Sequence, residues 1–123
     1  MPRILIVDDH VAVRTSLRLL FAVNGFEVCG EAVNGCDAIE KAQVLRPDLI
    51  VLDLSMPVMN GLDAARQLTK LMPKVPLIMF TNQISEIMKE EAREAGIRSI
   101  ISKNESCKKL INHALEVLDL REF

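Results

Sequence analysis

The chain alternates short apolar runs with longer amphipathic segments, and this alternation restricts its fold more than any other feature. The runs occupy residues 4–7, 26–32, 49–52, 77–80 and 97–101. Short runs that are rich in Ile, Val and Leu are typical of strands. We therefore predict five strands.

A segment with helical periodicity follows each run, because its apolar residues recur every three or four positions. The five predicted faces are Val13, Leu17, Leu20 and Phe21; Ala38, Ala42 and Leu45; Ala65, Leu68 and Met72; Ile84, Met88, Ala92 and Ala95; and Leu110, Ile111, Ala114, Leu115 and Leu118. Asn60, Ser85 and Ser106 are plausible helix starts, while Asn24-Gly25, Pro47, Pro73 and Gly96 are plausible stops. The chain therefore reads as five strand–helix repeats.

Strands joined by crossover helices pair in parallel, and continuously apolar strands belong in the middle of such a sheet. The runs at 4–7, 49–52 and 77–80 are continuous, whereas those at 26–32 and 97–101 are interrupted. In the run 26–32 we expect Phe26, Val28 and Ala32 to face one side and the glutamates the other. The fold class is therefore α/β: a single doubly wound, flavodoxin-like domain over residues 1–123, with a parallel five-stranded sheet in the order 2-1-3-4-5.

Composition excludes several functions. The 123 residues carry a net charge of −2 and contain four Phe, no Trp and no Tyr, so we expect no direct binding to nucleic acid. No signal peptide and no membrane-spanning run is evident, and the three cysteines lack metal-site spacing. We expect a cytoplasmic protein with reduced thiols that does not associate with membranes.

Polar side chains follow four of the predicted strands. Asp8 and Asp9 follow the first strand, Asp53 the third, Thr81 the fourth and Lys103 the fifth. Ligands of open parallel sheets bind beyond the carboxyl ends of the strands, at the point where the winding reverses. We expect these five side chains to converge there, between the first and third strands.

Each of these residues also has an ordinary interpretation when taken alone. Asp8 and Asp9 suit a helix cap, Asp53 a turn, Thr81 a cap of the next helix, and a single lysine is usually solvated. Their convergence favours a shared site.

Three carboxylates in contact resist full ionisation unless a cation lies among them. All-oxygen ligands favour Mg²⁺, which leaves coordination sites for phosphate oxygens. Asp53 is then a candidate nucleophile, with Lys103 and Thr81 suited to the phosphoryl oxygens. No GxxxxGK[ST] or GxGxxG motif is present. We interpret His10 as a helix-start residue at the rim of this site and His113 as a surface residue, and we expect neither to bind metal.

Four stretches of the chain together resemble the response-regulator receiver domains of two-component signalling. They are VDDH (7–10), RPDLIVLDLSMPVMNGLD (46–63), Thr81 after LIMF, and Lys103 after GIRSII. VDDH, GEAVNG and DLSMPVMNG are most similar to the NarL/FixJ-type (LuxR-class) subgroup. Its members usually carry a C-terminal DNA-binding domain, which would lie outside this chain.

The resemblance implies a role for each site residue. Asp53 would accept a phosphoryl group from a phosphohistidine of a sensor histidine kinase. Asp9, Asp53 and the backbone carbonyl of Ser55 would ligate Mg²⁺, for which Mn²⁺ can substitute, and Asp8 would act through a metal-bound water. Thr81 and Lys103 would then bind the phosphoryl group.

The resemblance also implies how a signal would leave the site. Movement of Thr81 and Lys103 toward the phosphoryl group would bias the face made by the fourth helix, fifth strand and fifth helix, and would control transcription through the linked domain. A homodimer on phosphorylation is compatible with this scheme.

Three positions depart from the family pattern. Ile100 replaces the usual Tyr or Phe switch residue, so the coupling uses another device and the first or fifth helix becomes a candidate for the dimer contact. Asn82 replaces a small residue after Thr81, which predicts a long-lived phosphorylated state. Asn104 replaces a proline after Lys103, which leaves the isomer of that peptide bond open.

Two other functions compete with the phosphoacceptor switch. An aspartate-nucleophile phosphatase would have a DxD motif after its first strand, but position 10 is His. A receiver-like interaction module would not need the intact set of acids, Thr81 and Lys103. We expect a regulatory domain that catalyses only its own phosphorylation and slow dephosphorylation, and no enzyme in the usual sense.

Overall fold

The computed structural model describes residues 1–122, with side chains described through Asp119. Strands and helices alternate along the whole chain, as predicted. They are β1 (Arg3–Val7), α1 (Val11–Val23), β2 (Glu27–Ala32), α2 (Gly35–Leu45), β3 (Leu49–Leu52), α3 (Gly61–Leu71), β4 (Leu77–Thr81), α4 (Glu86–Glu94), β5 (Ser99–Ser102) and α5 (Cys107–Glu122).

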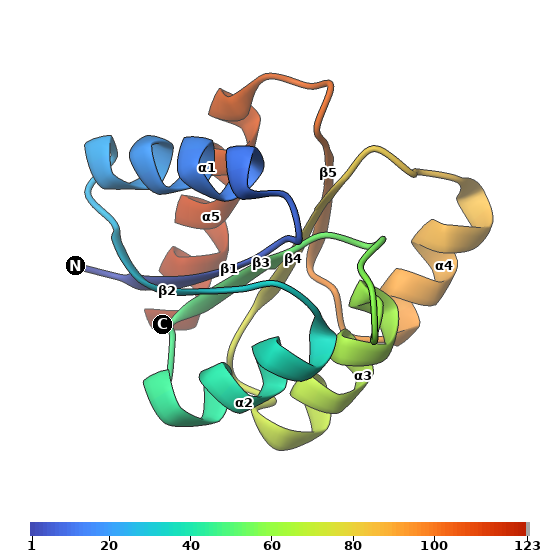
Figure 1. Ribbon diagram of the computed structural model, residues 1–123. Coiled ribbons are helices and arrows are strands. Elements are labelled where there is room, and N and C mark those ends of the chain that lie inside the picture. The colour runs from blue at the N-terminus through green and yellow to red at the C-terminus, as the bar shows by residue number, and fades with distance from the viewer. Residues whose placement is uncertain (123) are drawn as a thin grey trace.

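The five strands form one parallel sheet in the order β2-β1-β3-β4-β5, which confirms the predicted topology. Helices α1 and α5 cover one face, and α2, α3 and α4 cover the other (Figure 1). The register aligns Val7 with Leu52 and Thr81 with Ser102. The residues that follow these strands therefore lie along one edge of the sheet.

Alternate residues of the central strands supply two separate hydrophobic cores. Ile4 and Ile6 pack with α1 and α5, whereas Leu5 and Val7 pack with α2, α3 and α4. All four side chains are almost fully buried. Burial on both faces explains why β1 is continuously apolar.

The predicted facing of β2 is wrong in one respect. Phe26 and Val28 pack in the α1–α5 core, but Ala32 packs in the core on the opposite face. The register shifts there, since Ile4 pairs with Val28 and Leu5 with Gly30, which skips Cys29. One extra residue in a strand reverses the facing of every residue after it.

The starts of α3, α4 and α5 follow the predicted signals. The side chains of Asn60 and Ser85 cap α3 and α4 by accepting from the N–H groups of Asp63 and Met88. At the start of α5, Ser106 Oγ accepts from the N–H of Lys108 at 3.2 Å.

Two apolar positions differ from the predicted helix faces. Leu115 on α5 is 45% exposed, so it does not belong to the buried face. Ile84 lies before α4, although it packs against the core. Within residues 1–122, no helix is long and apolar enough to cross a membrane.

Candidate functional site

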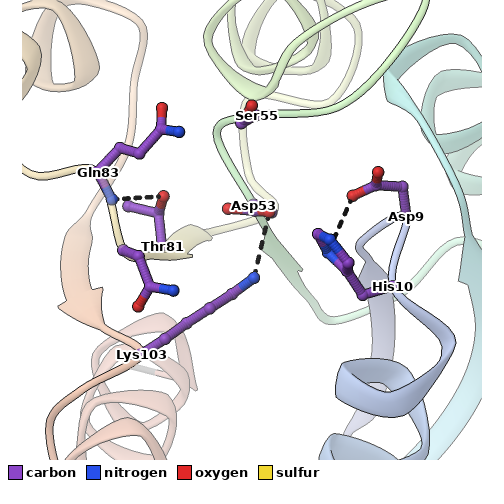
Figure 2. A pocket seen from close by; sticks show the side chains of 8 residues that line it. Asp9, His10, Asp53, Ser55, Thr81, Gln83 and Lys103 are labelled. Carbon is purple, nitrogen blue, oxygen red and sulfur yellow. Dashed lines mark hydrogen bonds and ion pairs between the residues drawn. The ribbon is translucent and has the colours of Figure 1, made fainter.

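A cleft opens at the carboxyl edge of the sheet (Figure 2). Its volume is about 270 Å³. Its lining residues are Asp9, His10, Asp53, Ser55, Thr81, Asn82, Gln83 and Lys103. The ends of β1, β3, β4 and β5 all contribute to it, so four strand ends that are distant in sequence meet in one place.

Asp53 lies at the base of this cleft because β3 ends beside β1. Its backbone N–H donates to the carbonyl of Val7 at 2.9 Å, which continues the β1–β3 pairing by one residue. One carboxylate oxygen, Oδ1, accepts from the N–H of Leu54 at 2.8 Å. Only 5% of Asp53 is exposed. The strand thus holds a nearly buried carboxylate in a fixed orientation.

The loop after Asp53 requires a glycine at position 61. A Cβ built on Gly61 would lie 2.1 Å from the carbonyl oxygen of Asp53, closer than any real contact. The N–H of Gly61 donates to the carbonyl of Leu54 at 2.8 Å, which closes the loop. Val58 in the same loop has a φ of 70°, a strained value for a β-branched residue. The loop is therefore built for close approach to Asp53.

Lys103 joins the acids of two different strands. Its Nζ donates to Asp8 Oδ2 at 2.8 Å and to Asp53 Oδ2 at 3.2 Å. Burial by itself would lower the pKa of Lys103, but the hydrogen bond to Asp8 and the charges of Asp53 and Asp8 outweigh it and raise the pKa above its ordinary value. The ammonium therefore stays charged between the two carboxylates.

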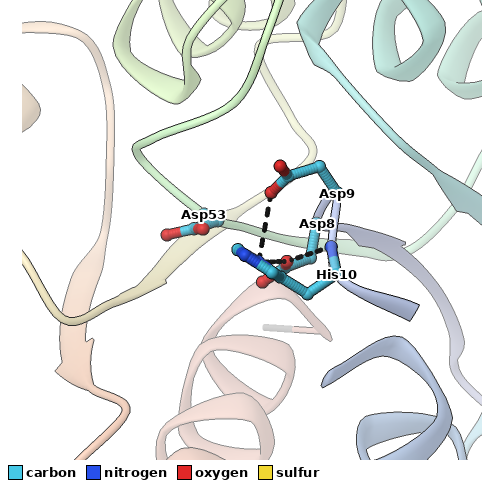
Figure 3. A group of neighbouring side chains, drawn as sticks. All are labelled: Asp8, Asp9, His10 and Asp53. Carbon is cyan, nitrogen blue, oxygen red and sulfur yellow. Dashed lines mark hydrogen bonds and ion pairs between the residues drawn. The ribbon is translucent and has the colours of Figure 1, made fainter. Parts of the chain in front are cut away.

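Asp8, Asp9, His10 and Asp53 form a cluster of metal-ligating side chains, drawn in Figure 3. One ligand atom from each residue lies within 4.8 Å of the others. Asp8 is 2% exposed, whereas Asp9 and His10 are at the surface. The prediction that the acids converge is confirmed, and the alternative that they cap α1 is wrong, because the N-cap residue is His10.

Thr81 is 1% exposed, and its Oγ1 accepts from the N–H of Gln83 at 3.2 Å. It does not cap α4, since Ser85 does. Asn82 is exposed and lines the cleft beside Thr81. The backbone N–H of Lys103 donates to the Thr81 carbonyl at 3.0 Å, so β4 and β5 position both side chains together.

Some features of the site were not predictable from the sequence patterns. Gln83 lines the cleft although it carries no motif signal, and the need for glycine at position 61 appears only in its contact with the Asp53 carbonyl. His113 was expected at the surface, but it is half-buried and its Nδ1 lies 3.1 Å from Ser99 Oγ. The Lys103–Asn104 peptide bond is trans, as are the other peptide bonds of residues 1–122.

The donor set of the cleft suits a hard divalent cation. Three carboxylates face one lysine, so negative charge exceeds positive charge among the charged side chains that meet there. Carboxylate and carbonyl oxygens are the ligands that Mg²⁺ and Mn²⁺ prefer. The acidic cluster can therefore hold a metal ion beside Asp53.

The doubly wound sheet places this protein in the class of flavodoxin-like domains. The acidic cleft at its switch point is a candidate site for a metal ion and a phosphoryl group. A family model for the response regulator receiver domain matches residues 4–115. The chain belongs to this family, whose members are the receiver domains of two-component response regulators.

Named relatives agree with this assignment. The chain is 40% identical to the chemotaxis protein CheY of Thermotoga maritima over 82% of its own length and 84% of CheY. It is 39% identical to the response regulator protein VraR of Staphylococcus aureus over 86% of its own length and 51% of VraR. It therefore spans most of CheY but about half of VraR.

A solved two-component response regulator of the LuxR family from Aurantimonas has the same fold. The TM-score is 0.92 and the identity 28%, with 97% of this chain and 86% of that chain covered. The subgroup that the sequence motifs indicate is thus represented among the structural neighbours.

Proposed function

We propose that this domain is a Mg²⁺-dependent phosphoacceptor switch in which Asp53 takes a phosphoryl group from a phosphohistidine of a sensor histidine kinase. The observation that carries the proposal is the position of Lys103, whose Nζ bridges Asp8 and Asp53 at the base of an open cleft. A carboxylate that is held beside a permanent cation, and that is open to a phosphoryl donor, is suited to in-line transfer.

In the proposed reaction a carboxylate oxygen of Asp53 attacks the phosphorus atom, and the bond between phosphorus and the histidine nitrogen breaks. The electron pair of that bond stays on the imidazole, and an acyl phosphate forms on Asp53. Lys103 offsets the negative charge on the transferred group, because its ammonium already lies 3.2 Å from Asp53 Oδ2. The buried hydroxyl of Thr81 supplies a hydrogen bond to the phosphoryl oxygens.

Asp9, Asp53 and the backbone carbonyl of Ser55 would hold Mg²⁺, or Mn²⁺ in its place, and Asp8 would support it through a bound water. The bound ion would neutralise charge on the phosphoryl oxygens. The acids that face the cleft support this role, since they outnumber the lysine that pairs with them.

Phosphorylation adds a charge of about −1.5 to −2 beside Thr81 and Lys103. We infer that both side chains move toward it and bias the face formed by α4, β5 and α5. Ile100 in β5 is half-buried against the core, in place of an aromatic switch residue. We therefore propose that the packing of Ile100, and not the rotation of an aromatic ring, transmits the change at Asp53. The first or fifth helix is the candidate dimer contact.

The wider setting is also a proposal. We infer that residues 1–123 act as the receiver of a cytoplasmic regulator and that a linked C-terminal DNA-binding domain carries the output to transcription. The domain itself is proposed to bind neither nucleic acid nor membrane, and to catalyse only its own phosphorylation and slow dephosphorylation.

Phosphorylation of the purified domain by a small phosphoryl donor tests the proposal directly. The purified domain is incubated with acetyl phosphate and Mg²⁺, and its intact mass is measured beside that of Asp53→Asn and of a sample in EDTA. We expect one added phosphoryl group in the wild type with Mg²⁺ and none in the other two. A wild type that gains no mass, or an Asp53→Asn variant that gains it, contradicts the proposal.

A further inference from the structure

We propose that the imidazole of His10 is a ligand of the metal site, and that it raises the affinity of this site for ions that accept nitrogen ligands relative to its affinity for Mg²⁺. The inference deepens the proposed function, because it rests on the proposed metal site of Asp9, Asp53 and the Ser55 carbonyl, with Asp8 beside it. It adds a residue and a metal preference to that site, and it reverses the expectation from the sequence that His10 does not bind metal.

Distances within the cluster carry the proposal. Nδ1 of His10 lies 3.0 Å from Asp8 Oδ1 and 3.2 Å from Asp9 Oδ1. Neighbouring ligands that lie about 2.1 Å from an octahedral ion are about 3.0 Å from each other. The spacing of Nδ1 and Asp9 Oδ1 is therefore close to that of two adjacent ligands of one octahedral ion, and Asp8 Oδ1 lies on the same side of the cluster.

The His10 ring is directed toward the acids and away from the helix that it begins. His10 is the N-cap residue of α1, yet its side chain makes no capping hydrogen bond. Its backbone N–H donates to Asp8 Oδ1 at 2.9 Å, which turns the residue back over the acids. Figure 3 shows the ring beside the carboxylates of Asp8 and Asp9, on the side that faces Asp53.

Lys103 and His10 do not compete for the same oxygen atoms. Lys103 contacts Oδ2 of Asp8 and Oδ2 of Asp53, whereas His10 contacts Oδ1 of Asp8 and Oδ1 of Asp9. The side chain of His10 is 63% exposed, so the ring has room to adjust as an ion enters. A metal on the His10 side therefore leaves the lysine in place for the phosphoryl group.

One nitrogen ligand changes which metal ions an otherwise all-oxygen site prefers. Imidazole suits Zn²⁺ and other first-row transition ions, whereas Mg²⁺ favours oxygen ligands and retains its waters. A site with oxygen ligands and one imidazole should therefore bind both classes of ion, but loss of the imidazole should substantially weaken only the binding of transition ions. This difference separates a ligand from a residue that merely shapes the cleft.

Calorimetric titration of the untagged domain with Zn²⁺ and with Mg²⁺ tests the preference. The variants are His10→Ala, His10→Asn, which keeps a residue favoured at helix N-caps, and His113→Ala, which removes the other histidine. We expect Zn²⁺ affinity at this site to fall about tenfold or more in both His10 variants and Mg²⁺ affinity to change little. His113→Ala should bind both ions as the wild type does. The exposed thiols of Cys36 and Cys107 are alkylated in every protein before titration, because free thiols would also bind Zn²⁺.

The nitrogen resonances of the imidazole provide a second readout. In the ¹⁵N-labelled domain, the Nδ1 signal of His10 should shift on addition of Zn²⁺, while that of His113 should not. A His10 signal that does not respond to Zn²⁺, or equal Zn²⁺ affinities of wild type and His10→Ala, overturns the proposal. Tighter binding of both ions by His10→Ala also overturns it, since His10 would then compete with the metal.

These outcomes are independent of the proposed phosphorylation. If Zn²⁺ binds through Nδ1 but acetyl phosphate and Mg²⁺ add no phosphoryl group, the proposed function fails and the ligand assignment stands. If phosphorylation occurs in both the wild type and His10→Ala while Nδ1 does not respond, only the ligand assignment fails.

Discussion

Charged side chains lie at both edges of the sheet, near the two ends of the same strands. Their ion pairs and hydrogen bonds differ between the edges. At the amino edge, the N–H of Arg3 donates to Asp48 at 2.8 Å, and the guanidinium of Arg3 pairs with Glu27 at 3.4 Å. At the carboxyl edge, Lys103 is shared between Asp8 and Asp53, while Asp9 pairs with the imidazole of His10. One arginine meets two acids at the first edge, whereas one lysine meets three acids at the second.

Burial sharpens this contrast. The Arg3–Glu27 pair is exposed to solvent, where an ion pair contributes little and costs little. Asp8, Asp53 and Lys103 are largely removed from water, where an unmatched charge destabilises the fold. The amino edge therefore holds charges that serve structure, and the carboxyl edge holds an arrangement that is better explained by binding a cation and a phosphoryl group.

The largest difference between the edges should appear when each loses its principal cation. Lys103→Met should slow phosphorylation by acetyl phosphate by about a hundredfold or more, because it removes the fixed positive charge beside Asp53. Arg3→Met, at the opposite edge, should leave the rate unchanged. Timed mass spectra at saturating Mg²⁺ measure both rates, and equal rates for the two variants would contradict the contrast.

Glycines at the two edges offer the next comparison. Gly61→Ala should lower the free energy of unfolding by about 1–3 kcal/mol and also slow phosphorylation, because its Cβ would collide with the Asp53 carbonyl.

Gly25 is the matched control, since its φ is 86° and nothing lies within 4 Å of an added Cβ. Gly25→Ala should cost about 1 kcal/mol through its backbone conformation alone and leave phosphorylation intact. Urea unfolding and the mass assay separate the two effects. A Gly61→Ala protein with wild-type kinetics would show that Asp53 tolerates a shift of its loop.

A substitution at Asn82 should have a smaller effect, on the lifetime of the phosphorylated state. Asn82 is exposed and lines the cleft next to Thr81. We therefore propose that its side chain restricts the approach of water to a phosphoryl group on Asp53. Asn82→Ala should lose its phosphoryl group several-fold faster than the wild type, as measured by the decay of the phosphorylated mass after removal of acetyl phosphate. Equal or slower loss in Asn82→Ala would refute this role.

The smallest effect is expected at the amino edge. Asp48→Ala removes the acceptor of the Arg3 N–H and should lower the free energy of unfolding by about 1 kcal/mol. Phosphorylation of this variant should match that of the wild type. A marked loss of phosphorylation in a folded Asp48→Ala protein would mean that the two edges are coupled.

The strand order and the convergence of the acids were predictable because each depends on a local pattern. Continuous apolar runs at β1, β3 and β4 mark central strands, and the first polar residue after each run marks the carboxyl edge. Facing along β2 was not predictable, since its sequence alternates regularly and conceals the skipped Cys29. A register shift depends on the partner strand, which a pattern within one strand does not contain.

The details of the site also depend on tertiary structure. The collision that requires glycine at position 61 involves the backbone of Asp53, eight positions earlier in the chain. The place of the His10 ring beside two acids results from a backbone turn at the start of α1. Residue types in sequence identified which groups meet, and only the packed structure shows which atoms face one another.

The most direct test of the central claim is to locate the phosphoryl group on the chain. After reaction with acetyl phosphate and Mg²⁺, borohydride reduces an aspartyl phosphate to homoserine, and peptide mass spectrometry then identifies the converted position. We predict conversion at Asp53 alone. Conversion at Asp8 or Asp9, or at no aspartate of a domain that has gained a phosphoryl group, would contradict the assignment.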